Sequence, residues 1–359
     1  MYRYADVRVV HLEMTSRCNA ACPMCARNIQ GGRVNPNMPL DELSLADIKK
    51  IFPPDFVARL KRMYMCGNYG DALVARDTAE TFEYFQEHNP RIDLRLWTNG
   101  SGRPAGWWKR LAGVLDACVF SIDGLEDTNH LYRRGTQWPK IMTAVEAFIG
   151  AGGAAEWEFL VFRHNEHQID AARELAATLG FKKFTPKRTD RFWRDGRRVE
   201  RTDVLDEEGR FEYHLEQPQS PAWRNAALAA IDKVTEGQKD YQSYLDTTEI
   251  DCKVQKDAQI FVSAEGLVLP CCWTGKLYVP EREVGEGQLW RMINSLPEGK
   301  DSLSARKHTL EEIVDGPFFQ DRIPGGWRPN EGKEKPRLAI CARLCGKFDL
   351  IKAMREPAS

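Results

Sequence analysis

Short apolar runs alternate with longer amphipathic stretches along the first half of the chain. The short runs are rich in β-branched and aromatic residues, as buried strands are, and the longer stretches place apolar residues three or four positions apart, as helices do. The predicted strands are 7–12, 62–66, 94–98, 117–122, 156–162 and 182–186. The predicted helices are 43–51, 78–88, 106–111, 139–149 and 169–179. Because strands and helices alternate, we predict an α/β fold with repeated βα units around a parallel sheet.

The last third of the chain has a different pattern. Residues 259–269 form two apolar, β-rich arms around an Ala-Glu-Gly turn, which predicts a β-hairpin. Residues 188–250, between the two patterns, begin with a crowd of arginines and continue with acidic and polar stretches. Such a basic segment could recognise an acidic peptide or a phosphate, although it more often forms a solvated face or a linker. The arginines are Arg191, Arg194, Arg197, Arg198 and Arg201.

Length, charge and cysteine content narrow the class of protein. With 359 residues, 42% of them apolar, two domains with separate cores are expected. The net charge of -1 gives no reason to expect a nucleic acid or a membrane surface as partner. Neither a transmembrane run nor a signal peptide is visible. Ten cysteines without an export signal therefore favour a reducing cytoplasm and metal ligation over disulfides.

Three cysteines follow the first predicted strand at C-x3-C-x2-C spacing: Cys18, Cys22 and Cys25. Three thiolates can hold three irons of a [4Fe-4S] cluster and leave the fourth iron open, whereas a structural metal site usually has a fourth protein ligand. A zinc knuckle, a disulfide with a spare thiol and three unrelated buried cysteines remain alternatives. The position after a strand favours the cluster, because loops at the carboxyl ends of parallel strands build the active sites of α/β barrels.

This spacing resembles the signature of the radical S-adenosylmethionine (SAM) superfamily. The resemblance implies a partial (β/α)6 TIM-like barrel over residues 1–190 and an open iron that chelates the amino and carboxylate groups of SAM. It also implies a contact between the cofactor and Met24, which lies inside the signature. No catalytic residue follows from the motif.

Three later strand ends also resemble superfamily motifs. Gly70 and Asp71 end a segment similar to the Gly-Gly-Glu motif, whose backbone and acidic side chain hold the SAM ammonium. The aspartate is one methylene shorter than the usual glutamate, and a plain Gly/Asn turn is the alternative. Asn99 lies in a Thr-Asn-Gly turn that resembles the one near the methionine part of SAM. Ser121 and Asp123 resemble the polar residues that reach the SAM ribose.

Two candidate sites with less specific sequence patterns follow the fourth and fifth strands. Arg133 and Arg134 could bind a carboxylate of SAM or of a substrate, since guanidinium groups suit carboxylates, or could form a surface salt bridge. The loop after the fifth strand lies where such barrels contact the cofactor, but a solvated loop is the favoured interpretation. Its polar residues are Arg163, His164, Asn165 and His167.

A second set of cysteines lies near the predicted hairpin. The spacing C-x13-G-x4-C from Cys252 to Cys271 resembles the opening motif of SPASM and twitch domains, which carry auxiliary iron-sulfur clusters. Most of the later SPASM cysteines are missing, which favours the shorter twitch form with one auxiliary [4Fe-4S] cluster. Cys272 could replace its neighbour as a ligand, and a structural zinc in the same thiolates is an alternative. The four predicted ligands are Cys252, Cys271, Cys341 and Cys345.

The predicted organisation is a partial barrel at 1–190, a bridging segment at 191–250 and a small α+β twitch/SPASM-like domain with a β-hairpin at 251–359. Three thiols outside or beside the ligand sets, those of Cys66, Cys118 and Cys272, are candidate hydrogen donors. Because Cys66 and Cys118 lie in predicted strands, burial in the core is the simpler interpretation for these two.

The resemblance implies an oxidoreductase or isomerase that cleaves SAM to a 5'-deoxyadenosyl radical, which abstracts hydrogen from a substrate C-H bond. Peptide oxidation, cross-linking or epimerisation is the first prediction, and a flavodoxin or ferredoxin is the expected electron donor. Against a peptide substrate, the first strand begins at Val7 and leaves no room for an N-terminal leader-binding module. The alternatives are a small-molecule dehydrogenase or epimerase acting on a sugar, cyclitol or amino acid, and a non-catalytic iron-sulfur or zinc scaffold.

Overall fold

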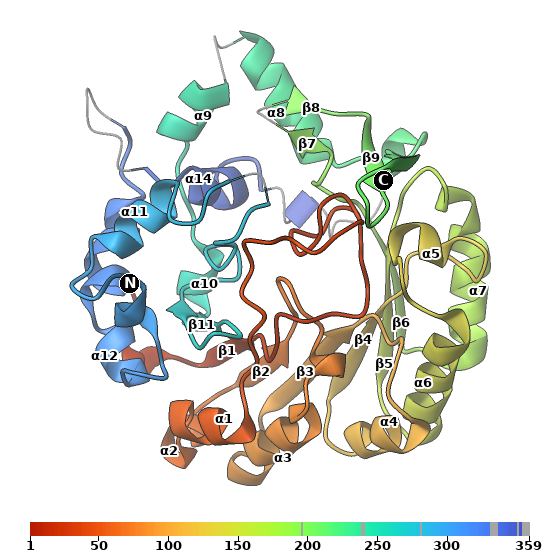
Figure 1. Cartoon of the computed structure of the whole chain (residues 1–359), viewed down its shortest axis with the longest axis horizontal. Coiled ribbons are helices and arrows are strands. Elements are labelled where there is room, and N and C mark those ends of the chain that lie inside the picture. The colour runs from red at the N-terminus through yellow and green to blue at the C-terminus, as the bar shows by residue number, and fades with distance from the viewer. Residues whose placement is uncertain (195–196, 238–240, 281, 331–336, 350–351, 354–359) are drawn as a thin grey trace.

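A curved sheet of eight strands organises the computed structural model, which describes residues 1–194, 197–237, 241–280, 282–330, 337–349 and 352–353 (Figure 1). The strand order is β12-β11-β1-β2-β3-β4-β5-β6, and β1 to β6 are parallel neighbours in chain order. The predicted α/β partial barrel is therefore confirmed. Its strands are β1 (Val9–Leu12), β2 (Arg62–Met65), β3 (Asp93–Thr98), β4 (Ala117–Ser121), β5 (Ala155–Leu160), β6 (Lys183–Lys187), β11 (Gln259–Val262) and β12 (Val268–Leu269).

Helices between the strands cover the outer, convex side of this sheet (Figure 1). Each of the five predicted helices is present, with bounds that agree to within two residues. The helices of this half are α1 (Leu45–Ile51), α2 (Pro54–Ala58), α3 (Thr78–His88), α4 (Ala105–Ala112), α5 (Asn129–Tyr132), α6 (Trp138–Gly150) and α7 (Ile169–Leu179). Short 3-10 turns are η1 (Tyr4–Asp6), η2 (Ala72–Val74) and η3 (Glu166–Gln168).

The two faces of the sheet differ because successive side chains of a strand point to opposite sides. In β2, β3 and β5 every second residue is buried, mostly against the helices. Phe120 of β4, for example, packs against Trp108 of α4 and Phe148 of α6. The alternate set includes Tyr64 and Glu158 and is only partly buried. The sheet thus has one apolar core face and one polar face that solvent reaches in part.

The predicted hairpin exists, but it extends the barrel sheet. β11 and β12 pair antiparallel, which confirms the hairpin, and β11 also pairs in parallel with β1 from Val9↔Gln259 to Leu12↔Val262. All four residues of β11 are buried, as expected for a strand covered on both faces. The arrangement gives partners to the backbone groups on the free edge of β1. The sheet therefore crosses the predicted domain limit at residue 251.

The remaining chain forms small ribbons and short helices. The bridging segment contains two separate two-stranded antiparallel ribbons, and the C-terminal helices lie beyond β1, on the opposite side from α7 (Figure 1). In the described ranges no helix is both long and apolar enough to cross a membrane. The elements are β7 (Trp193–Arg194), β8 (Arg197–Arg198), β9 (Arg201–Leu205), β10 (Phe211–Glu216), η4 (Pro221–Trp223), α8 (Ala226–Gly237), α9 (Tyr241–Thr247), α10 (Lys253–Lys256), α11 (Gln288–Asn294), η5 (Gly299–Leu303), α12 (Leu310–Val314), the π-helical η6 (Phe318–Arg322), α13 (Ile323–Gly325) and α14 (Ala339–Cys345).

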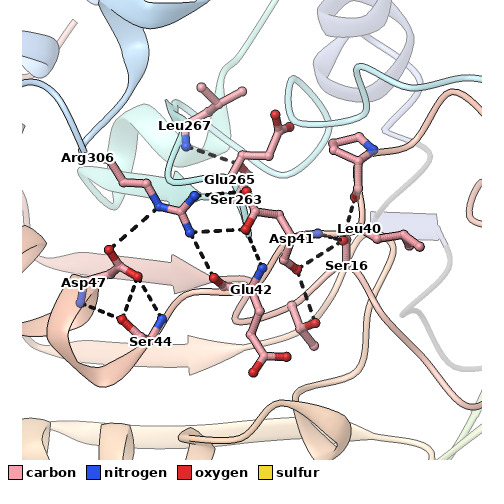
Figure 2. Close-up of polar contacts among 12 residues, drawn as sticks. Ser16, Leu40, Asp41, Glu42, Ser44, Asp47, Ser263, Glu265, Leu267 and Arg306 are labelled. Atoms are coloured by element: carbon pink, nitrogen blue, oxygen red, sulfur yellow. Dashed lines mark hydrogen bonds and ion pairs between the residues drawn. The ribbon is translucent and has the colours of Figure 1, made fainter.

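Arg306 connects the C-terminal part of the chain, the residues after β12, to the segment that follows β1 (Figure 2). Its guanidinium donates to the Asp41 carboxylate at 3.0 and 3.3 Å and to the Glu42 carbonyl at 2.9 Å, and its Nε lies 3.8 Å from the Asp47 carboxylate. The Asp41 backbone N–H in turn donates to Ser16 Oγ at 2.9 Å. Because Ser16 opens the cysteine loop, the C-terminal part is joined to that loop by consecutive polar contacts.

Candidate functional site

The loop after β1 brings Cys18, Cys22 and Cys25 together. The Cys25 N–H donates to the Cys22 carbonyl at 3.0 Å, which closes a tight turn. Burial, together with Asp71 and the two other thiols, raises the pKa of the Cys18 thiol. Among the residues that the structure describes, no three histidine, cysteine, aspartate or glutamate side chains stand ready to hold a single metal ion.

Nitrogen donors surround two of these sulfur atoms. The Ala20 N–H lies 3.3 Å from Cys18 Sγ, and Asn99 Nδ2 lies 3.8 Å from the same atom. Arg133 Nη1 lies 3.9 Å from Cys22 Sγ. Hydrogen bonds to sulfur stabilise thiolates and tune iron-sulfur clusters. The donor set therefore fits an anionic cluster held by this loop.

Asp71 joins the loops after β2 and β3. One carboxylate oxygen accepts from Thr98 Oγ1 at 2.9 Å and from the Leu73 N–H at 3.0 Å. The other accepts from the N–H and the side-chain amide of Asn99, at 2.8 and 2.9 Å. Burial raises the pKa of Asp71 despite these bonds. Both oxygens are thus engaged within the protein, and the role of Asp71 toward the SAM ammonium stays a prediction.

Gly70 lies where the loop after β2 crosses the cysteine loop. A Cβ atom on Gly70 would stand 1.7 Å from the Thr15 carbonyl oxygen, so only glycine allows this approach. The Asp71 N–H donates to the Arg17 carbonyl at 2.9 Å. The crossing places the predicted Gly-Gly-Glu-like segment directly against the cysteine loop.

Glu13 is a buried carboxylate that the sequence interpretation missed. It accepts from the N–H groups of Tyr69 and Gly70, at 2.7 and 3.1 Å. Burial raises its pKa to about 7, while the backbone hydrogen bonds oppose the shift. The signal in the sequence was an acidic residue directly after an apolar strand, one position before Met14.

The loop after β4 turns Arg133 toward the cysteines and Arg134 away from them. Arg133 Nε donates to Asp123 at 2.6 Å, and the same carboxylate accepts from the Leu160 N–H at 2.6 Å. Arg134 instead contacts Glu212 and the Tyr213 hydroxyl of β10. The structure thus places Arg133 at the site and directs Arg134, the predicted cofactor residue, toward the β9–β10 ribbon.

Two further predicted contacts, Ser121 and Met24, are half-buried near these loops. In the loop after β5 the solvated interpretation fits the exposed Arg163 and His167. It does not fit Asn165, which is fully buried and donates to the carbonyls of Asp123 and Leu160 at 2.9 Å each. His164 is partly buried, and burial lowers its pKa to about 4.

The four cysteines of the second set come from separate segments that meet in the C-terminal part. Burial raises the pKa of Cys341, and the neighbouring thiols of Cys271, Cys345 and Cys252 raise it further. Cys341 and Cys345 share one face of α14, and the Asp251 N–H donates to the Cys345 carbonyl at 2.8 Å. The structure therefore places the four predicted thiols near one another, although among the described residues they do not form a ready metal site.

Cys272 has other neighbours than this set. Burial raises the pKa of its thiol, and after Cys271 the acidic groups acting on it include Cys66 and Glu13, which belong to the barrel. Asn68, in the loop after β2, donates to the Cys272 carbonyl at 2.6 Å. The sequence interpretation also missed Lys276, which is partly buried and holds its ammonium 4.0 Å from the centre of the Trp273 ring.

The two remaining thiols differ in their surroundings. Cys118 is fully buried in the core between sheet and helices, as expected for a small apolar residue. Cys66 is only partly buried, and the charges that act on its thiol include the Glu158–Lys187 ion pair, whose atoms are 2.9 Å apart. The core interpretation therefore holds for Cys118 and is wrong for Cys66.

The strand order and the place of the cysteine loop agree with the partial barrel that the sequence resemblance implies, and solved structures with bound S-adenosylmethionine share this fold. Streptococcus suis SuiB bound to S-adenosylmethionine is 12% identical over 94% of this chain and 77% of SuiB, with a TM-score of 0.51. Histidine-tagged anSMEcpe with bound AdoMet is 14% identical over 97% of this chain and 92% of that one, with a TM-score of 0.53. At these identities the likeness shows a shared fold. No family model and no curated protein sequence matches the chain.

A third structure contains a peptide. Native anSMEcpe with bound AdoMet and the Cp18Cys peptide is 15% identical over 93% of this chain and 87% of that one, with a TM-score of 0.52.

Proposed function

We propose that this chain is a radical SAM enzyme that modifies a peptide. The observation that carries the proposal is the position of Cys18, Cys22 and Cys25 in the loop after the first strand of a radical SAM partial barrel, with Asn99 and Arg133 donors beside the sulfur atoms. When bound, a [4Fe-4S] cluster supplies the electron that cleaves SAM to methionine and a 5'-deoxyadenosyl radical, the species that abstracts hydrogen from a C-H bond.

The chain's own residues prepare this site. The three thiolates would hold the cluster, and Arg133 adds a positive charge next to Cys22, which favours the thiolate form. Asp123 holds the Arg133 side chain through the 2.6 Å contact, so Asp123 is a positioning residue in this proposal and does not bind the ribose itself. Ser121, half-buried at the end of β4, remains the residue proposed to contact the ribose.

SAM would lie between the loops after β2 and β3. The segment that ends at Gly70 would present its backbone to the SAM ammonium, because its crossing over Thr15 fixes it next to the cysteine loop. Asp71 keeps the two loops together through Thr98 and Asn99. These contacts hold the binding loops in place before the cofactor arrives, which reduces the ordering that binding must bring about.

The second cysteine set is proposed to hold one auxiliary [4Fe-4S] cluster. This ligand set is supported by the effects of neighbouring thiols on one another's pKa. Cys271 and Cys345 raise the pKa of both Cys252 and Cys341. The barrel groups that act on Cys272 support Cys271 as the ligand. With four thiolates no iron is left open, so electron transfer or a structural role follows, and zinc is the alternative occupant.

A peptide is the proposed substrate because the peptide-bound anSMEcpe structure shares the fold over 93% of this chain. The partly open, polar face of the sheet, which carries Cys66, Glu158 and Lys187, offers hydrogen-bonding groups to such a substrate. A flavodoxin or ferredoxin in a reducing cytoplasm remains the predicted electron donor.

Anaerobic reconstitution with iron and sulfide counting tests the proposal. The wild type is expected to bind about eight irons, and a variant with Cys18, Cys22 and Cys25 all changed to Ala about four, with loss of 5'-deoxyadenosine formation. Cys118→Ala is the matched control, because its thiol lies in the core away from both sets. Four irons in the wild type that all disappear in the triple variant would contradict the auxiliary cluster. Wild-type iron without any cleavage of SAM would contradict the enzyme assignment.

A further inference from the structure

A cavity of about 320 Å³ opens on the surface of the C-terminal part. One wall is the exposed side of α11, and the other comprises η6, α13 and the turn after α13. Three guanidinium groups line it, those of Arg291, Arg322 and Arg328, together with the carboxylate of Asp321. We call this cavity, defined by the three arginines, the arginine pocket.

The walls of the arginine pocket are fixed by buried contacts. Trp290 and Ile293 anchor α11 in the core, and Trp290 Nε1 donates to the Leu277 carbonyl at 3.0 Å. Gly326 forms part of the floor, where a Cβ would stand 2.8 Å from the Leu338 side chain and 3.1 Å from Met292. The Gln288 side chain bonds to the backbone of residues 337 and 339, at 2.9 and 3.0 Å. The two walls of the arginine pocket are therefore held in place by the packing and hydrogen bonds of the fold.

The charges of the arginine pocket are not balanced within the described part of the chain. All three arginines are exposed, and no ion pair or side-chain hydrogen bond joins any of them to another described residue. By comparison, exposed Arg110 pairs with Glu80 and Glu83, and exposed Arg210 pairs with Asp206 and Glu208. Three positive charges against the single Asp321 leave an excess that an anionic ligand would neutralise.

The arginine side chains of the pocket suit a ligand with several carboxylate groups along a peptide segment. Guanidinium groups bind carboxylates through paired N–H donors, and arginine clusters recognise acidic peptide motifs. Small ligands usually occupy pockets that bury most of their surface. Here the arginines are exposed at the rim and come from separate elements, which suits a segment that passes across the opening.

We propose that the arginine pocket binds an acidic segment of the peptide substrate, at a distance from the residue that is modified. This inference rests on the proposed function for the identity of the ligand as a substrate. The Leu338 N–H donates to the Gly326 carbonyl at 2.7 Å, and α14 with Cys341 and Cys345 begins at the next residue. The docked segment would therefore lie on the same part of the molecule as the second cysteine set.

Fluorescence anisotropy with a labelled peptide of alternating Glu and Gly tests the site on the reconstituted full chain. A peptide with Gln in place of Glu serves as the neutral probe, and inorganic phosphate as a competitor. We expect the acidic peptide to bind and the neutral peptide to bind at least about tenfold more weakly. Rising salt concentration should weaken the binding of the acidic peptide. The double variant Arg291→Gln with Arg322→Gln should lose about tenfold or more in affinity for the acidic peptide.

The double variant Arg76→Gln with Arg91→Gln is the matched control, since both residues are exposed and the change in net charge is the same. Equal weakening in both double variants would overturn the pocket, because general charge would then explain binding. Equal binding of the acidic and neutral peptides, or tighter binding of phosphate than of the peptide, would also overturn it.

Formation of 5'-deoxyadenosine is measured in the same preparations to separate the two proposals. Arginine-dependent peptide binding without cleavage of SAM would contradict the proposed enzyme function and leave the acidic-peptide site in place. Cleavage of SAM with peptide binding indifferent to the arginines would contradict the site alone.

Discussion

Buried carboxylates brace the loops at the carboxyl end of the sheet. Asp71, Asp123 and Glu13 each follow a strand; Asp71 and Glu13 accept hydrogen bonds from another loop, and Asp123 accepts one from Leu160 at the end of β5. The sequence predicted the first two as cofactor contacts, because strand ends carry active sites in barrels. It could not show their partners: Asp71 bonds to Thr98 and Asn99, and Asp123 to Arg133 and Leu160, which local patterns do not reveal.

Glu13→Gln should change how stability depends on pH. Burial raises the Glu13 pKa from 4.5 to about 7, so the folded protein holds this proton more tightly than the unfolded chain. Its contribution to stability is complete below about pH 4.5 and is lost as the pH rises to about 7, at about 1.4 kcal/mol per pH unit. Chemical unfolding of the wild type and the variant at several pH values measures the difference, and the variant should lack this slope.

The exposed Glu126 provides the control for this titration. Glu126→Gln should retain the wild-type dependence on pH. If the difference in unfolding free energy between wild type and Glu13→Gln stays constant from pH 4.5 to 7, the shifted titration of Glu13 does not exist.

Arg133→Lys should impair the cysteine loop, whereas Arg134→Lys should not. Lysine keeps the charge of Arg133 but cannot contact Asp123 and Cys22 together as the planar guanidinium does. We expect a loss of about 10- to 100-fold in 5'-deoxyadenosine formation, the range for residues that support metal ligands. Arg134 contacts Glu212 on a partly exposed surface, so its lysine variant should match the wild type. Equal rates in the two variants would argue against Arg133 as a positioning residue.

At the scale of helices and strands, the sequence predicts those elements that depend on residues close together in the chain. The six barrel strands and the helices between them follow from alternating periodicities, and the observed bounds differ by few residues. The cysteine sets follow from spacing. The pairing of β11 with β1 could not be predicted, because the pattern at Gln259–Val262 shows an apolar strand but not its distant neighbour. For the same reason the exposure of Cys66 to the polar face was missed.

The crossing of the loop after β2 over the cysteine loop can be tested with two glycines. Gly70→Ala would put a Cβ 1.7 Å from the Thr15 carbonyl oxygen, and the loops would have to move apart. We expect a loss of about 3 kcal/mol in unfolding free energy and incomplete binding of iron. Gly106→Ala is the matched control, because no atom lies within 4 Å of its Cβ position in α4. That helix substitution should stabilise the protein by about 0.5 to 1 kcal/mol. Normal iron content in Gly70→Ala would refute the tight crossing.

At the scale of the whole molecule, Arg306 is one of the side chains that connect the residues after β12 to the segment after β1 (Figure 2). Arg306→Ala removes the bonds to Asp41 and Glu42, and we expect a loss of about 1 to 2 kcal/mol in unfolding free energy, measured by denaturant titration. The neighbouring Lys307 pairs with Asp301 at the surface, so Lys307→Ala should cost well under about 1 kcal/mol. Similar losses in the two variants would show that Arg306 makes only a surface contact.

The parallel pairing of β1 with β11 also has a consequence for the order of events on the ribosome. β1 leaves the exit tunnel early, but the strand that covers its edge comes from the last third of the chain. Until then the nascent sheet exposes a row of unpaired backbone groups, to which strands of other chains can attach. Contacts between such distant segments also form slowly. We therefore expect the cell to need a chaperone, or slow translation, after the barrel helices have been synthesised and before the β11–β12 hairpin has been synthesised.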